Sequence, residues 1–234
     1  MIDPMAEILG SADPKRAEFQ RRTVPGMALE CHGAPMPALR RIAGEICRGD
    51  WRAFLSSEPR CEEEVVLRAL VIAGADMGSG ERLRRTEAFL PEVTDWAVCD
   101  TLCGGWRIDG AEGRDALWRM CESLIGSGDG FRMRVAAVMM LCHFLDDAHI
   151  DGVLSMLSEA GHPEYYFRMG SAWALSSAYV RYPEKTEAAL FSGRLDPWIR
   201  NKAVQKIRES YRVSGADKER LRERNRLMRA PRPS

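Results

Sequence analysis

Four residues in this sequence carry side chains that could act together on a cationic substrate. Trp96 and Asp100 stand four positions apart in TDWAVCDTLC, so a helix places the indole and the carboxylate on one face. Arg134 in FRMRVAAVMML and Trp173 in RMGSAWALSSAY each lie inside a later segment with apolar periodicity. If these segments pack as neighbouring helices, two indoles, a carboxylate and a guanidinium line one groove, and such a groove would suit a cation.

The elements that must position these residues are helices that recur at a regular interval. Helical segments are expected to begin near Glu62, Glu92, Asp129, Glu164 and Asp196, at offsets of 30, 37, 35 and 32 residues. Each is followed by a turn rich in Gly, Pro, Asp and Ser and then by a second helix. Almost no stretch alternates with period two for long enough to form a strand. The sequence therefore predicts an all-α fold, an α-solenoid of HEAT-like helix pairs.

The same patterns predict a single HEAT-like repeat domain over residues 1–234. Residues 1–36 are expected to hold an N-terminal helix and a linker, with a short charged helix from about Pro14 to Thr23. Stacked helix pairs follow over 37–213, and a basic terminal helix and tail over 214–234. A chain of this length can bury a substantial core without disulfides or metals.

The charge is balanced overall but unevenly distributed. Lys and Arg number 34, as do Asp and Glu, which argues against a generally basic nucleic-acid-binding surface. From Trp198 to Ser234 there are 12 Lys and Arg against 4 Asp and Glu, so the first 197 residues carry a net charge of −8. The charged terminal helix allows two interpretations, a solvated cap on the solenoid or a phosphate-binding element.

Cysteine and hydropathy patterns point to a soluble cytoplasmic protein without membrane association. The seven Cys include no CxxC pair, and the sequence has neither a secretory signal nor an apolar run of roughly 18 residues. Cys99 and Cys103 stand at helical spacing, and we expect buried free thiols there rather than a metal or redox site. The four His are scattered without ligand spacing, so we expect no metal and no cofactor.

Each candidate residue also has a purely structural interpretation. A Trp inside an apolar helix usually packs in the core, which applies to Trp96 and Trp173. An ionised Asp100 in a helix interior must either have a partner or face a wet groove. Arg134 could be that partner, in an ion pair between adjacent repeats. Five other aromatic side chains are expected to be packing or rim residues, namely Trp106, Trp118, Trp198, Tyr165 and Tyr166.

Several of these segments, in this order, resemble the AlkD-like family of DNA alkylation repair glycosylases, which are HEAT-like α-solenoids. GAPMPALRRIAGEI is similar to the family's early Gly-x-x-x-Pro-x-x-Arg segment, and EEEVVLRALVIAGADM continues the likeness. The family's catalytic Trp and Asp motif falls on Trp96 and Asp100, its Arg on Arg134 and its second active-site Trp on Trp173. NKAVQKIRESYRV resembles the closing helix.

This resemblance implies a DNA glycosylase, a hydrolase that excises cationic N3- or N7-alkylated purines from duplex DNA. A monomer is expected because solenoids of this size are often monomeric. A cationic purine is already a good leaving group, so no general acid is required. Asp100 would stabilise the positive charge that builds on the sugar and could orient the attacking water. Trp96 and Trp173 would contact the lesion, and Arg134 would bind a backbone phosphate.

A second hypothesis stays open, a catalytically silent HEAT-like module that binds nucleic acid or protein. Characterised members of the family have a further Arg three residues after the second Trp, and this chain has Ser176 there. The repeat region is also net acidic, whereas neutralisation of phosphates supplies most non-specific affinity for DNA.

Overall fold

The computed structural model describes residues 2–24 and 27–229, and within these ranges the chain is all-α. The prediction of an all-α fold is confirmed, with no strand among the described residues. The tail predicted at 230–234 lies outside them. The helices, with one 3-10 helix η1, are α1 (Pro4–Gly10), α2 (Pro14–Thr23), α3 (Met36–Arg48), α4 (Trp51–Ser56), α5 (Glu62–Gly74), α6 (Ser79–Phe89), η1 (Leu90–Glu92), α7 (Trp96–Gly105), α8 (Gly110–Ile125), α9 (Gly130–His143), α10 (Ile150–Glu159), α11 (Tyr165–Arg181), α12 (Pro183–Leu190), α13 (Pro197–Glu209) and α14 (Gly215–Arg229).

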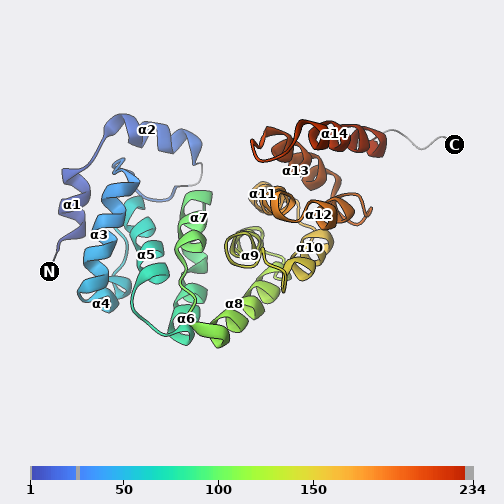
Figure 1. The fold of residues 1–234 in the computed structure, drawn as a ribbon. Coiled ribbons are helices and arrows are strands. Elements are labelled where there is room, and N and C mark those ends of the chain that lie inside the picture. Colours follow the sequence, from blue (N-terminus) through green and yellow to red (C-terminus); the bar gives the residue numbers. More distant parts are fainter. Residues whose placement is uncertain (1, 25–26, 230–234) are drawn as a thin grey trace. The chain divides into compact units, whose positions relative to one another are not determined.

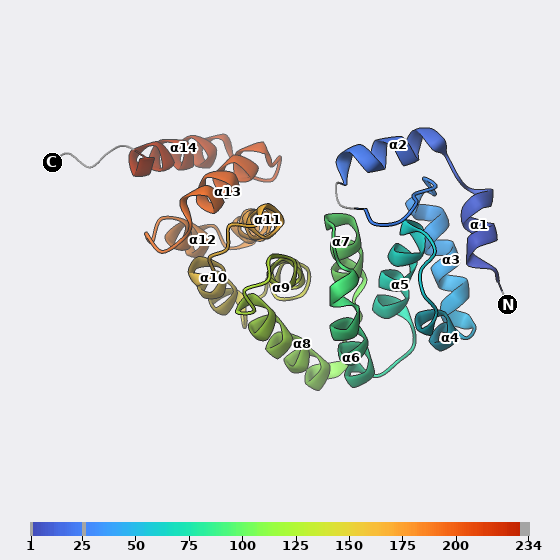
Figure 2. The ribbon, with the colours of Figure 1, turned by 180° about the vertical axis from the view of Figure 1, so that it is seen from behind.

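The chain divides into two compact units, Met1–Met120 and Cys121–Ser234, and the division falls within α8. In the first unit α5 packs between α3 and α7. In the second unit, α11 packs between α9 and α13, and α10 packs against α12. Figure 2 shows the same neighbouring helices from behind. The prediction of one repeat domain over the whole chain stays a prediction. None of the described helices is both long and apolar enough to cross a membrane.

The first helices of successive pairs start at nearly constant intervals. From α5 to α13 they begin at 62, 96, 130, 165 and 197, which gives intervals of 34, 34, 35 and 32 residues. The prediction of a helix start near Glu92 is off by one turn, because Leu90–Glu92 forms a 3-10 helix and Asp95 caps α7. With this correction the interval is more regular than the sequence pattern indicates.

Acidic N-caps explain where many of these helices begin. The side chain of Asp95 accepts hydrogen bonds from the N–H groups of Ala97 and Val98 at 2.6 and 3.0 Å. Asp129, Glu164 and Asp196 cap α9, α11 and α13 in the same manner. Such a cap satisfies helical N–H groups that have no partner inside the helix and contributes about 1 kcal/mol.

The N-terminal loop of the first unit is fastened to the start of α5 by a buried carboxylate. Oε1 of Glu63 accepts hydrogen bonds from the N–H groups of three successive residues, His32 at 2.9 Å, Gly33 at 2.6 Å and Ala34 at 3.2 Å. Beside it, Glu62 accepts from the N–H of Leu29 at 2.7 Å. Burial raises the pKa of Glu62 above its ordinary value. These contacts fix the loop that leads into α3.

A buried guanidinium closes the other end of α5. Arg82, only 1% exposed, donates to the carbonyl oxygens of four residues. The acceptors are Ile72 at 2.7 Å, Ala73 at 2.8 Å, Ala75 at 2.9 Å and Met77 at 3.1 Å. Burial lowers the pKa of Arg82. One side chain thereby provides donors for carbonyl groups of the last turn of α5 and of the loop that follows it.

The terminal helix α14 packs onto the second unit through charged contacts. Oε2 of Glu187 on α12 accepts from Arg220 at 2.9 Å, and Oε1 accepts from Arg224 at 2.8 Å. Arg200 of α13 donates through Nε to Oδ1 of Asn225 at 3.1 Å, and both residues are buried. The helix is therefore anchored along one face, and most of its other described side chains are exposed.

Candidate functional site

The first pair of predicted site residues lies on the exposed side of α7. Val98, Cys99, Leu102 and Cys103 form the buried side of this helix, and both Cys are free thiols as predicted. Trp96 is the first residue of α7 and Asp100 follows one turn later, away from that buried side. Trp96 is 38% exposed and Asp100 is partly exposed. The i, i+4 spacing thus places an accessible indole and an accessible carboxylate on one face.

The second pair lies on α9 and α11 of the other unit. Arg134 is only 5% exposed, and its Nη1 donates to the backbone oxygen of Tyr166 at 2.8 Å. Gly170 allows the two helices to approach closely here, since a Cβ at this position would lie 3.3 Å from Cγ of Arg134 and would require a small shift of that side chain. Trp173 lies on α11 one turn beyond Gly170 and two turns beyond Tyr166, and it is 38% exposed. The burial of Arg134 favours a role in holding α9 against α11.

Trp173 opens onto a cavity of about 850 Å³ that lies within the second unit. Three cationic side chains also line this cavity, Arg181 at the end of α11, Lys206 on α13 and Arg212 after it. Ser176 lines it too, and its hydroxyl donates to the backbone oxygen of Trp173 at 2.9 Å. One carboxylate, Asp146, lines the cavity as well, so the cations exceed the anions by two. An indole beside this excess of positive charge offers both a stacking surface and sites for phosphate oxygens.

Sequence reasoning missed these three cations. Lys206 follows the pattern of the exposed face of α13, which predicts only a solvated side chain. Its position beside Trp173 depends on the packing of α11 against α13. For Lys206 and Arg212 the available signal was the excess of basic residues after Trp198, which locates cations near the C-terminus but does not assign them to a cavity. Arg181 lies before that region and had no such signal.

The structure thus brings together Trp96 with Asp100 on α7, and places Arg134 and Trp173 on two helices that pack against each other. The two pairs belong to different units. The common site expected from the sequence for all four residues therefore stays a prediction.

Residues 5–207 match a protein family described as DNA alkylation repair enzyme. The chain belongs to this family. The match covers every helix from α2 to α12 and most of α13, and it includes all four predicted site residues. None of the curated proteins matches the chain.

Proposed function

We propose that this chain is a DNA glycosylase that excises cationic N3- or N7-alkylated purines from duplex DNA, as a cytoplasmic monomer. One observation carries the proposal: in a member of a DNA alkylation repair family, Trp96 and Asp100 share an accessible face of α7. The carboxylate supplies the charge, and the ring supplies the surface on which a cationic base can rest.

The chemistry needs little from the protein because alkylation has already made the purine a good leaving group. As the bond between C1′ and the base nitrogen stretches, positive charge develops on the deoxyribose. Asp100 stabilises this charge electrostatically, and a carboxylate oxygen can orient the water that attacks C1′. The bonding electrons leave with the base, whose positive charge they neutralise, so no proton has to be delivered by a general acid.

Selectivity follows from the charge of the lesion. Trp96 and Trp173 contact the cationic base and its sugar through their rings, at about 0.5 to 2 kcal/mol each, and a neutral base gains less. Arg181, Lys206 and Arg212 bind backbone phosphates beside Trp173. These contacts position the strand and read no sequence.

The deciding experiment measures release of free base. Purified protein in excess is incubated at low salt with duplex DNA that contains 7-methylguanine or 3-methyladenine. We expect release by the wild type and a loss of about 10²- to 10³-fold in rate for Asp100→Asn, the scale for losing one electrostatic group from a transition state. Asp115→Asn, which removes an exposed carboxylate from α8, is the matched control. Absence of release by the wild type would rule out the proposal.

A catalytically silent binding module is the second candidate. The observation that favours it is Ser176, whose hydroxyl is bonded to the backbone of its own helix and which contributes no charge beside Trp173. Under this alternative Asp100→Asn leaves DNA affinity unchanged and no variant alters the amount of free base. The base-release assay, run together with a DNA-binding assay, separates the two candidates.

A further inference from the structure

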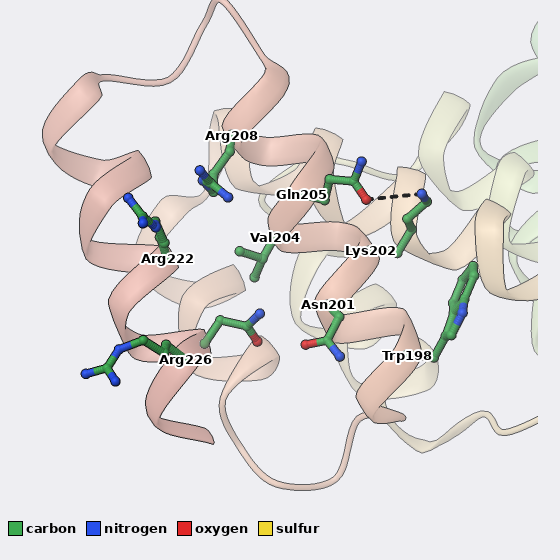
Figure 3. Close-up of a pocket in the computed structure, with 9 residues that line it drawn as sticks. Trp198, Asn201, Lys202, Val204, Gln205, Arg208, Arg222 and Arg226 are labelled. Carbon is green, nitrogen blue, oxygen red and sulfur yellow. Dashed lines mark hydrogen bonds between the residues drawn. The ribbon is translucent and has the colours of Figure 1, made fainter. Parts of the chain in front are cut away.

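A second groove, of about 610 Å³, lies between α13 and α14 and shares no residue with the predicted site. Four cations line it, Lys202 and Arg208 from α13 and Arg222 and Arg226 from α14. Figure 3 shows Arg208 extending toward α14, while the guanidinium of Arg226 extends outward at the margin. No carboxylate is among the lining residues.

The cations of this groove are accessible to an anion. The ammonium group of Lys202 donates to the amide oxygen of Gln205 at 3.1 Å. Arg222 and Arg226 pair on the outside of α14 with Glu219 at 3.3 Å and Glu223 at 2.7 Å, and all four side chains are more than half exposed. Exposed pairs of this kind contribute about 0 to 1 kcal/mol, so a phosphate can compete for the arginines. Among the described residues, Arg208 has no carboxylate within ion-pair distance.

The groove also concentrates positive charge in a chain that is otherwise acidic. Residues 197–229, which hold α13 and α14, contain eleven Lys and Arg and four Asp and Glu, an excess of seven. Three of these cations, Arg200, Arg220 and Arg224, anchor α14. Of the others, Lys202, Arg208, Arg222 and Arg226 line the groove, and Lys206 and Arg212 line the Trp173 cavity. Positive charge that attracts a polyanion is therefore concentrated in this region.

Aromatic rings at one end of the groove indicate which polyanion fits. Trp198 lines the groove, and its ring contacts Tyr165 with centroids 5.9 Å apart at 72°. Tyr165 is 55% exposed and also contacts the ring of Tyr166, with centroids 5.5 Å apart. A basic groove that ends at an exposed aromatic ring is the arrangement that binds single-stranded nucleic acid, with phosphates on the cations and a base stacked on the ring.

We propose that the α13–α14 groove binds an unpaired segment of a DNA strand, with phosphates held by Lys202, Arg208 and Arg222 and one base stacked on Tyr165. This contact goes beyond base release, because it needs neither a lesion nor Asp100. It would hold a strand that is locally unpaired, as DNA around damage can be. An acidic peptide could bind to the cations of the groove, but it has no base to stack on the ring of Tyr165.

The test measures binding of two fluorescent probes to the full chain by anisotropy, an undamaged oligothymidine and an abasic strand of the same length. The double variant Arg208→Gln/Arg222→Gln is expected to bind both probes with about tenfold lower affinity at low salt. It should also reduce the slope of log K against log salt by about 1.4, the value for two single-strand phosphate contacts. Lys185→Gln/Arg194→Gln removes the same charge outside the groove and should leave that slope unchanged.

Tyr165→Leu tests the stacked base. This variant should bind oligothymidine with about tenfold lower affinity and should bind the abasic strand as the wild type does. Circular dichroism melting of each variant shows whether the fold is retained. The proposal is overturned if the double variant binds the probes with the same affinity as its control, or if Tyr165→Leu lowers the affinity for both probes equally. It is also overturned if the wild type binds duplex DNA but neither single-stranded probe. Asp100→Asn should bind both probes like the wild type, so loss of base release and loss of groove binding are separate outcomes.

Discussion

The indole Nε1 of Trp96 donates a hydrogen bond to the backbone oxygen of Thr23 over 3.2 Å. Thr23 is the last residue of α2 and Trp96 the first of α7, so this contact joins the N-terminal helices to the proposed site. The bond uses the edge of the ring and not its π face. The orientation of the ring is therefore set by a backbone acceptor 73 residues earlier in the chain.

We expect Trp96→Leu to raise the half-saturating concentration of methylated duplex in the base-release assay. The loss of a cation–π contact of about 0.5 to 2 kcal/mol corresponds to roughly a 2- to 30-fold change. Trp96→Phe keeps an aromatic face but lacks the N–H donor, so its effect should be smaller. Phe19→Leu, an exposed aromatic on α2, is the control. Equal values for the Leu variant and the wild type would show that the ring does not contact the lesion.

Arg134 has two possible roles that respond differently to salt. Its burial and its hydrogen bond to Tyr166 favour positioning, so Arg134→Gln should lower the melting temperature of the second unit and leave the salt dependence of DNA affinity unchanged. A phosphate ligand would instead reduce the slope of log K against log salt by about one. Arg132→Gln, an exposed cation two positions away on α9, controls for the loss of charge. A reduced slope with unchanged melting would contradict the positioning role.

Helix starts were predictable where a cap and the apolar pattern agree. Asp129, Glu164 and Asp196 are N-caps that stand directly before apolar periodic segments, and the expected starts there are confirmed. The short helix over Pro14–Thr23 is confirmed as well. The start near Glu92 was wrong, because Pro91 favours a 3-10 turn and the true cap follows it. The sequence contained no pattern for α1, which is only seven residues long.

The candidate site was predictable only within a single helix. The shared face of Trp96 and Asp100 follows from helical geometry alone. The burial of Arg134 and the cations near Trp173 depend on which helices pack together, and sequence spacing does not contain that information. Arg82 illustrates the same difference: its partners are backbone carbonyl groups, which every residue carries, so no side-chain motif points to them.

Replacing Arg82 should destabilise the first unit strongly. Arg82→Met removes the donor of the carbonyl groups of Ile72, Ala75 and Met77 in a buried site, at a cost of at least about 3 kcal/mol. The carbonyl of Ala73 keeps the N–H of Arg107 at 3.2 Å. Arg84→Met removes an exposed arginine from the same helix and should cost less than about 0.5 kcal/mol. Urea unfolding followed by circular dichroism measures both. Similar midpoints for the two variants would refute the role of Arg82.

Gly33 should tolerate no side chain. Its φ is +80°, and a Cβ there would collide with the backbone oxygen of Asp13 and lie 2.6 Å from the backbone nitrogen of Ala17. Gly33→Ala should therefore displace the loop from Glu63 and lower stability by about 2 to 4 kcal/mol. Gly10→Ala has open space around the new Cβ and is the control. Faster hydrogen exchange at the N–H groups of residues 32–34 would show that the loop has moved away from Glu63. Unchanged exchange at these groups would contradict the prediction.

The attachment of α14 should depend on pH through Glu187. Burial of this carboxylate opposes ionisation, but the hydrogen bonds from Arg220 and Arg224 outweigh it and lower the pKa of Glu187 below its ordinary 4.5. A lowered folded-state pKa contributes stability that is present above 4.5 and is lost as the pH falls through the folded value. The melting temperature of the wild type should therefore exceed that of Glu187→Gln at pH 7, and the difference should shrink below pH 4.5. Glu184→Gln, an exposed residue of the same helix, should show no such convergence. A gap between wild type and Glu187→Gln that persists at low pH would mean that the two arginines do not hold α14 through this charge.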